Sequence, residues 1–240
     1  MFEFFANSLW NGYAISSMMG KLIVWAQIAG SVYMITLAIG KWRELSYVAT
    51  AARRVNRDVM GGKDVLEYYL ARHPSAHTAL ENIYWATCER LLKLLAPDVR
   101  SLLVGRQPGA AAALTAHEMG LVKALSEHVL DEEEIRVEKG MGGIATVVTL
   151  APMLGLLGTV WGVLDAFADM GAAGSATIAT MAPAIASALV TTVVGLLIAI
   201  PGVFIHTRLS AMLRDLMADM EGFTDDLTGR IALEFQGRAS

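Results

Sequence analysis

The chain has 240 residues, of which 55% are hydrophobic and 18% are charged, and its mean hydropathy is +0.48. These values exclude an ordinary soluble domain, and the concentration of apolar residues in long runs indicates membrane spans. The net charge of −4 gives no basis for nucleic-acid binding. The single cysteine, Cys88, cannot form a disulfide within the chain and is expected to be a small buried residue.

The N-terminal residues 1–18 do not resemble a cleavable signal peptide, because the first positive charge is Lys21. They are rich in aromatic side chains, which favour the boundary between membrane and water. These are Phe2, Phe4, Phe5, Trp10 and Tyr13. We predict that residues 1–18 form an external, interfacial amphipathic segment and that the following apolar run is a retained span.

Three runs without formal charge are long enough to cross a membrane. They contain 19, 25 and 38 residues and extend over 22–40, 140–164 and 170–207. A helix rises about 1.5 Å per residue, so roughly 20 residues cross the hydrocarbon core. We predict an all-α integral membrane protein with transmembrane helices over 19–40, 141–167 and 177–206 and an external turn over 168–176.

Basic residues indicate the direction of these spans, because they accumulate on the cytoplasmic side. They follow the first span, precede the second and follow the third: Lys41, Arg43, Arg53, Arg54, Arg57, Arg136, Lys139, Arg208 and Arg214. The turn between the second and third spans has Asp165 and Asp169 and neither Lys nor Arg. This places the N-terminus in the periplasm and the C-terminus in the cytoplasm.

Residues 41–139 are predicted to form a cytoplasmic helical domain, with helices over about 41–60, 63–72, 75–96 and 110–139. The last lacks a breaker before the second span, so we expect one continuous helix there. The acidic run DEEE (131–134) is interpreted as a solvated face rather than a metal site. His73 and His77 flank Pro74, which favours surface positions over a paired metal site.

The C-terminal segment 207–240 is predicted to be a cytoplasmic helix with one apolar stripe. The stripe consists of Leu209, Leu213, Leu216, Met220, Phe223, Leu227 and Ile231. It could pack within its own chain or against further copies of the chain, and the sequence leaves both open.

The sequence has no G-x-S-x-G, H-E-x-x-H or P-loop motif, so we expect no enzyme, cofactor or metal site. The span cores contain no acidic or basic side chain, which means that they cannot hold a proton alone. Their polar atoms come from Gln27, Ser31, Tyr33, Thr36, Thr146, Thr149, Thr159, Thr177, Thr180, Ser187, Thr191 and Thr192. Such hydroxyls could line an ion path or could bond to their own helix.

Small residues accompany these hydroxyls. Gly155, Gly158 and Gly162 lie on one side of the second span, at a spacing that permits close helix approach. In the third span a broad small surface is formed by Ala184, Ser187, Ala188, Thr191, Thr192 and Gly195. Pro152 and Pro183 complete the expected packing motif, and Pro152 is expected to bend the helix.

Two segments, APMLGLLGTVWGVLDAF (151–167) and MAPAIASALVTTVVGLLIAIPGVFIHTRL (181–209), resemble the MotA/TolQ/ExbB proton-channel family, and most of all its TolQ/ExbB branch. The resemblance implies an inner-membrane homo-oligomer, a pentamer, with long helical cytoplasmic extensions. It implies a pore around the helices of an ExbD/TolR-like partner with a single span and a membrane aspartate. The transported ion would be H⁺, and a TonB/TolA-like protein would receive the work.

The resemblance implies that Thr159 and Thr192 correspond to the pore threonines of the family, and that Ser187 and Thr191 also line the pore. One departure matters: the family usually has glutamate in AP-G-I-A-E-AL, whereas this chain has Ser187, and Ala184 replaces the glycine. The MotA branch also lacks that glutamate but has four spans. The alternatives are a scaffolding membrane protein without ion conduction and a secondary transporter, against which the lack of inverted repeats counts.

Overall fold

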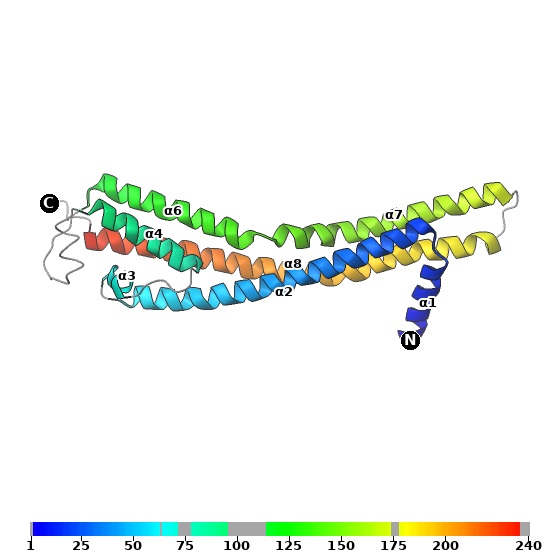
Figure 1. Ribbon diagram of the computed structural model, residues 1–240, viewed down its shortest axis with the longest axis horizontal. Helices are drawn as coiled ribbons and strands as arrows, with labels where there is room; N and C mark the ends of the chain where they lie inside the picture. The colour runs from blue at the N-terminus through cyan, green and yellow to red at the C-terminus, as the bar shows by residue number, and fades with distance from the viewer. Residues whose placement is uncertain (1, 63, 72–77, 96–113, 174–177, 236–240) are drawn as a thin grey trace. The chain divides into compact units, whose positions relative to one another are not determined.

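The computed structural model describes residues 2–62, 64–71, 78–95, 114–173 and 178–235 (Figure 1). Apart from turns and a backbone bridge at Leu114, these residues are helical, which confirms the all-α prediction for this part of the chain. The helices are α1 (Phe2–Ala14), α2 (Met18–Met60), α3 (Glu67–Ala71), α4 (Ala79–Leu94), α6 (Ala116–Glu138), α7 (Met141–Ala173) and α8 (Ile178–Phe235).

Three helices are long and apolar enough to cross a membrane, in agreement with the predicted number of spans. They are α2, the α7 region and α8, and each extends beyond what a bilayer requires. The helix α8 continues through Pro183 and Pro201 without interruption, so the predicted third span and C-terminal helix form one element.

The predicted continuous helix that joins 110–139 to the second span, 141–167, was wrong. The helix α6 ends at Glu138, and α7 begins at Met141. Between them Gly140 has φ of +97°, a left-handed conformation that glycine adopts without the steric penalty of a Cβ atom. The glycine therefore separates two helices whose flanking residues contain no proline.

Two compact units make up the chain. The first combines Met1–Trp42 with Gly140–Ser210, and the second combines Arg43–Lys139 with Ala211–Ser240. Within the first unit, α1 packs on its neighbours at two points. The Trp25 Nε1 donates to the Tyr13 hydroxyl at 3.1 Å, and a Cβ atom on Gly12 would meet the Val190 side chain.

The apolar stripe of α8 is buried, and six of its seven residues belong to the second unit. All seven stripe residues are at most 7% exposed within the chain itself. The stripe therefore packs inside its own chain, which decides between the two alternatives left open by the sequence. The same core contains Cys88, which is fully buried and whose pKa burial raises to about 12, as expected of a small structural residue.

Two of the predicted helices begin at threonine capping boxes. Thr78 and Thr115 each accept from the backbone N–H of the glutamate three residues later, which bonds back to them. The helices therefore start at Ala79 and Ala116 rather than near 75 and 110. Residues 72–77 and 96–113, which include His73 and His77, lie outside the described residues.

The predicted helix over 63–72 is shorter in the structure, where α3 has five residues. Tertiary hydrogen bonds occupy the backbone just before it. The Val65 N–H donates to the Glu234 carboxylate at 3.1 Å, and the Val65 carbonyl accepts from the Tyr84 hydroxyl at 2.6 Å. The Tyr69 N–H, which would bond to the Val65 carbonyl in a regular helix, donates instead to the Tyr84 hydroxyl at 2.9 Å, so the helix is not continued backwards from α3.

Arg230 caps the C-terminal end of α2. Its guanidinium donates to the carbonyls of Val59 at 2.9 Å, Met60 at 3.1 Å and Gly62 at 2.9 Å. The last carbonyls of a helix lack partners within the helix, so this side chain satisfies them.

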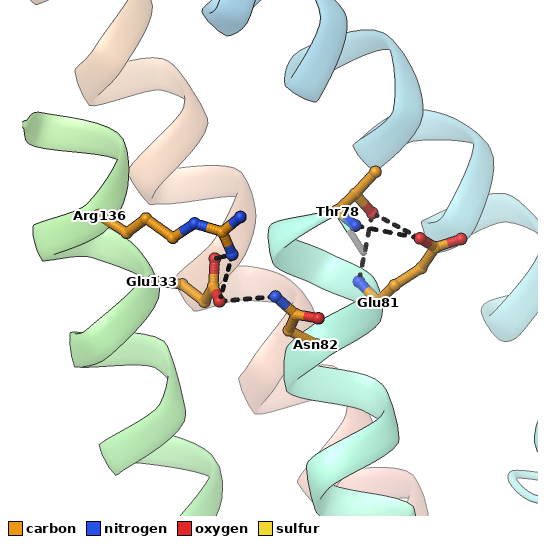
Figure 2. A network of polar contacts seen from close by, with 5 residues as sticks. All are labelled: Thr78, Glu81, Asn82, Glu133 and Arg136. Atoms are coloured by element: carbon orange, nitrogen blue, oxygen red, sulfur yellow. Dashed lines mark hydrogen bonds and ion pairs between the residues drawn. The ribbon is translucent and has the colours of Figure 1, made fainter. Parts of the chain in front are cut away.

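The acidic run 131–134 is only partly a solvated face, which corrects the prediction. Asp131 and Glu132 are exposed, whereas Glu133 is buried. The Glu133 carboxylate accepts from Asn82 of α4 at 2.7 Å and pairs with Arg136 at 3.2 Å (Figure 2). Among the described residues, no group of three or more His, Cys, Asp or Glu side chains could hold a metal ion.

Glu134 lies near other negatively charged side chains. Its Oε1 atom is buried and has no hydrogen-bond partner among the described residues. Burial, followed by the charges of Glu221, Asp131 and Glu138, raises the pKa of this carboxyl. The folded state therefore binds a proton here more readily than the unfolded chain does.

Replacing Arg230 with leucine should weaken the local structure at the end of α2 by about 2 kcal/mol, the typical value of charged hydrogen bonds. Hydrogen exchange of the amides over 61–66 measures this loss and should accelerate by roughly tenfold or more. The exposed Arg214, replaced in the same way, is the control. Equal protection in the two variants would contradict the capping role.

Glu134→Gln should stabilise the folded protein at neutral pH. The parent loses stability as the pH rises through the raised pKa, whereas the amide does not titrate. The difference in unfolding midpoint should vanish as the pH falls below the ordinary glutamate value of about 4.3. Denaturant titrations at several pH values test this, with the exposed Asp219→Asn as the control expected to show no such trend.

Candidate functional site

The glycine face of α7 meets the small face of α8 within the first unit. A Cβ atom on Gly162 would meet the Ala188 side chain, and one on Gly158 would meet the Thr191 side chain. A Cβ atom on Gly155 would lie 2.8 Å from the Thr192 Cα atom. Residue numbers rise along one helix as they fall along the other, so α7 and α8 are antiparallel at this contact.

Two adjacent threonines of α8 share one backbone acceptor on α7. The Thr192 hydroxyl donates to the Gly155 carbonyl at 2.8 Å. The Thr191 hydroxyl lies 3.1 Å from the same carbonyl and 2.7 Å from that of Ala188. These bonds between helices are possible because glycine lets the two backbones approach closely.

Thr159 lies one helical turn beyond Gly155, on the same face of α7. Its hydroxyl donates within its own helix, to the Leu156 carbonyl at 2.7 Å. The Ser187 hydroxyl likewise bonds to the Ala184 carbonyl at 2.9 Å. The four predicted site residues therefore all use their hydroxyl hydrogens on carbonyl groups.

Burial divides these four residues into two pairs. Ser187 is 6% exposed and Thr191 is 1% exposed, so the chain itself encloses both. Thr159 and Thr192 are partly exposed. Only the second pair can contact another molecule without a rearrangement of this chain.

Gln27 joins the site from the first span, and its role was not predicted. Its Nε2 atom donates to the Ala151 carbonyl of α7 at 3.0 Å and to the Thr191 carbonyl of α8 at 3.1 Å. The signal available in the sequence was a lone amide in an uncharged run of 19 residues. Polar groups in such runs are rare enough to mark a site, but sequence gave no indication of which carbonyls they reach.

The proline and glycine positions of the packing motif differ in their surroundings. The helix α7 continues through Pro152, and Pro183 is exposed on α8. Gly195 is buried, and a Cβ atom there would lie 2.5 Å from the Ala151 carbonyl oxygen. Gly195 therefore allows close approach to α7, as Gly155 does to α8.

The chemistry that this surface supports is limited to hydrogen bonding. Hydroxyls and one amide are its polar groups, and the nearest carboxylates on α7, Asp165 and Asp169, lie one or more turns beyond Thr159. Hydroxyls can accept or relay a hydrogen bond but do not store a proton at physiological pH. A titratable group would have to come from another molecule.

Comparison with known proteins agrees with the family resemblance noted in the sequence. The sequence model of the MotA/TolQ/ExbB proton channel family matches residues 103–222, which is half of the chain. The chain is 27% identical to the Tol-Pal system protein TolQ of Pseudomonas aeruginosa, over 92% of this chain and 90% of that protein. It is 28% identical to TolQ of Haemophilus influenzae, over 93% of each.

A third relative matches a shorter part of the chain more closely. The biopolymer transport protein ExbB of Xanthomonas campestris is 37% identical over 123 residues, which are 51% of this chain and 48% of that protein.

Gly155→Ala should destabilise the first unit, because the added Cβ atom would lie 2.8 Å from the Thr192 Cα atom and 2.9 Å from the Thr191 carbonyl oxygen. Backbone atoms cannot move aside cheaply, so we expect a loss of about 2 kcal/mol. Gly142→Ala on the same helix is the control, since nothing lies within 4 Å of its added Cβ atom. Thermal unfolding in detergent should show a lower midpoint for the first variant alone.

Proposed function

Because the chain belongs to the MotA/TolQ/ExbB proton channel family, we propose that it is the proton-channel, stator-like subunit of a motor driven by the proton motive force. The similarity to TolQ and ExbB proteins supports a membrane motor subunit of the Tol/Exb type. Its work would be done on the cell envelope.

The observation that carries this proposal is the partly exposed pair Thr159 and Thr192 on a span surface without carboxylates. Both hydroxyls are oriented by carbonyl groups, and both belong to the segments that resemble the family. A protonated carboxyl on another helix could donate a hydrogen bond to such a surface while water is excluded. The surface would then guide the proton without storing it.

A surface that guides a proton without storing it needs a partner that carries the titratable group. We propose that copies of the chain assemble as a pentamer around the single-span helices of an ExbD/TolR-like protein whose membrane aspartate carries H⁺. A TonB/TolA-like protein would take the resulting motion to the outer membrane. The names of the relatives, a Tol-Pal system protein and a biopolymer transport protein, support envelope tasks of this class.

The proposed location is the bacterial inner membrane, with several spans. The distribution of Lys and Arg supports a periplasmic N-terminus and a cytoplasmic C-terminus. The second unit, which contains 43–139 and 211–240, would then lie in the cytoplasm. Spectroscopic labelling of single cysteines placed in each unit would test this orientation.

One observation favours the alternative, a scaffolding membrane protein without ion conduction. All four site hydroxyls are bonded to carbonyls of α7 or α8, as they would be if they served only packing. The two functions differ in whether removing a hydroxyl changes proton flux or only stability.

Thr159→Val and Thr192→Val should each reduce proton flux by roughly tenfold or more, since one hydrogen bond of about 1.4 kcal/mol corresponds to that factor. Valine keeps the shape of threonine, so assembly should persist. The measurement is flux into proteoliposomes that contain the chain and its single-span partner. Thr192→Ser, which keeps a hydroxyl, should restore much of the flux.

Thr36→Val is the matched control, because Thr36 is exposed on α2 and bonds to the Val32 carbonyl of its own helix. It should leave the flux unchanged. Normal flux in both the Thr159 and the Thr192 variants would overturn the assignment of these residues and favour the scaffolding function.

A further inference from the structure

Gln27 of α2 hydrogen-bonds to both α7 and α8. It is 2% exposed, and its Nε2 atom uses both hydrogens, at 3.0 Å on the Ala151 carbonyl and at 3.1 Å on the Thr191 carbonyl. The opposite orientation of the amide would set its oxygen against two carbonyl oxygens. The network therefore fixes which way the amide points.

The surrounding backbone is shaped to admit this amide. A Cβ atom on Gly195 would lie 2.9 Å from Nε2, and one on Gly155 would lie 3.4 Å from it. Both glycines also face the carbonyls that the amide binds: Gly195 faces that of Ala151 and Gly155 that of Thr191. Residues from three helices thus meet at one amide group.

The two carbonyls lie on either side of the Thr192 site. Ala151 is one turn before Gly155, whose carbonyl accepts from Thr192, and Thr191 directly precedes Thr192. A side chain that holds Ala151 and Thr191 together therefore sets the register of α7 against α8 next to Thr192. A shift of one residue along either helix would separate Thr192 from Gly155.

Stabilisation of the fold does not explain why residue 27 is a glutamine. Its Oε1 atom is buried and has no hydrogen-bond partner among the described residues. An unpaired acceptor in an apolar region is unfavourable, and an apolar side chain of similar length, such as methionine, would avoid it.

We propose that Gln27 is a positioning residue for proton transfer. It holds α7 and α8 in the register at which Thr159 and Thr192 present their hydroxyl oxygens to the titratable group of the partner. This inference rests on the proposed function, and it adds a residue from the first span to a surface otherwise formed by the second and third.

Three variants in the full chain, reconstituted with its single-span partner, test the inference. Gln27→Met removes both donors and should lower the flux per assembled complex roughly tenfold at every pH. Gln27→Glu keeps one O–H donor while its carboxyl is protonated and none when it is ionised. Its flux relative to the parent should therefore fall as the pH rises. Thr36→Val should match the parent throughout.

The change in pH profile is specific to the introduced carboxyl. Over the described residues 22–40, 141–164 and 181–205, which include the parts of α2, α7 and α8 around Gln27, there is no Asp, Glu, Lys, Arg or His. Tyr33 is the phenol in these ranges, and its hydroxyl lies near Gly143, two turns from Ala151. The partner's own titration is present in the parent and cancels in the ratio.

The outcomes separate this inference from the proposed function. A merely structural role would lower the thermal midpoint of Gln27→Met with unchanged flux per complex, and it would leave the Gln27→Glu profile parallel to that of the parent. Either result overturns the inference, while impaired Thr159→Val and Thr192→Val variants would still uphold the function. If Gln27→Met does not fold, the ratio for Gln27→Glu at acid and neutral pH decides alone.

Discussion

The close approach of α7 and α8 is the constraint on which the rest of the first unit depends. It requires glycine at 155, 158, 162 and 195, since a Cβ atom at each of these positions would meet the neighbouring helix. Because the backbones are so close, threonine hydroxyls of α8 can reach a carbonyl of α7, and one amide of α2 can reach both. The apolar medium then strengthens these few polar contacts, because no water competes for them.

Part of the structure could be predicted from the sequence, and part could not. Uncharged runs and the stripe that ends at Ile231 predict helices and buried faces, because burial follows periodicity. The glycine spacing from Gly155 to Gly162 predicts a close contact. The break between α6 and α7 at Gly140 was a local signal, because a glycine directly after a basic last turn favours a helix end. The burial of Glu133 depends on Asn82, a residue far away in sequence. Pattern and propensity contain the first of these signals but not the second.

The site was predictable to a similar extent. Resemblance and composition led to Thr159 and Thr192, and the structure adds that they are more accessible than Ser187 and Thr191. The distinction depends on helix rotation, which a pattern of hydroxyls spread over two helices does not fix. Gln27 was visible as an unusual residue, but its partners are 124 and 164 positions away in the chain, so their identity is a tertiary property.

The orientation of the hydroxyls bears on which form of a carboxyl they can receive. A threonine hydroxyl has one donor hydrogen and two acceptor lone pairs. Thr159 donates to Leu156 and Thr192 to Gly155, so both hydroxyls can only accept from another molecule while those bonds persist. On the proposed function, this surface suits the protonated, neutral carboxyl of a partner, which donates a hydrogen bond. The ionised form would be accommodated only if a hydroxyl left its carbonyl. With the neutral Ser187 beside the two threonines, the wall adds no negative charge of its own. The preference for a neutral carboxyl then rests on the two carbonyl-bound threonines and on the helix register that supports them.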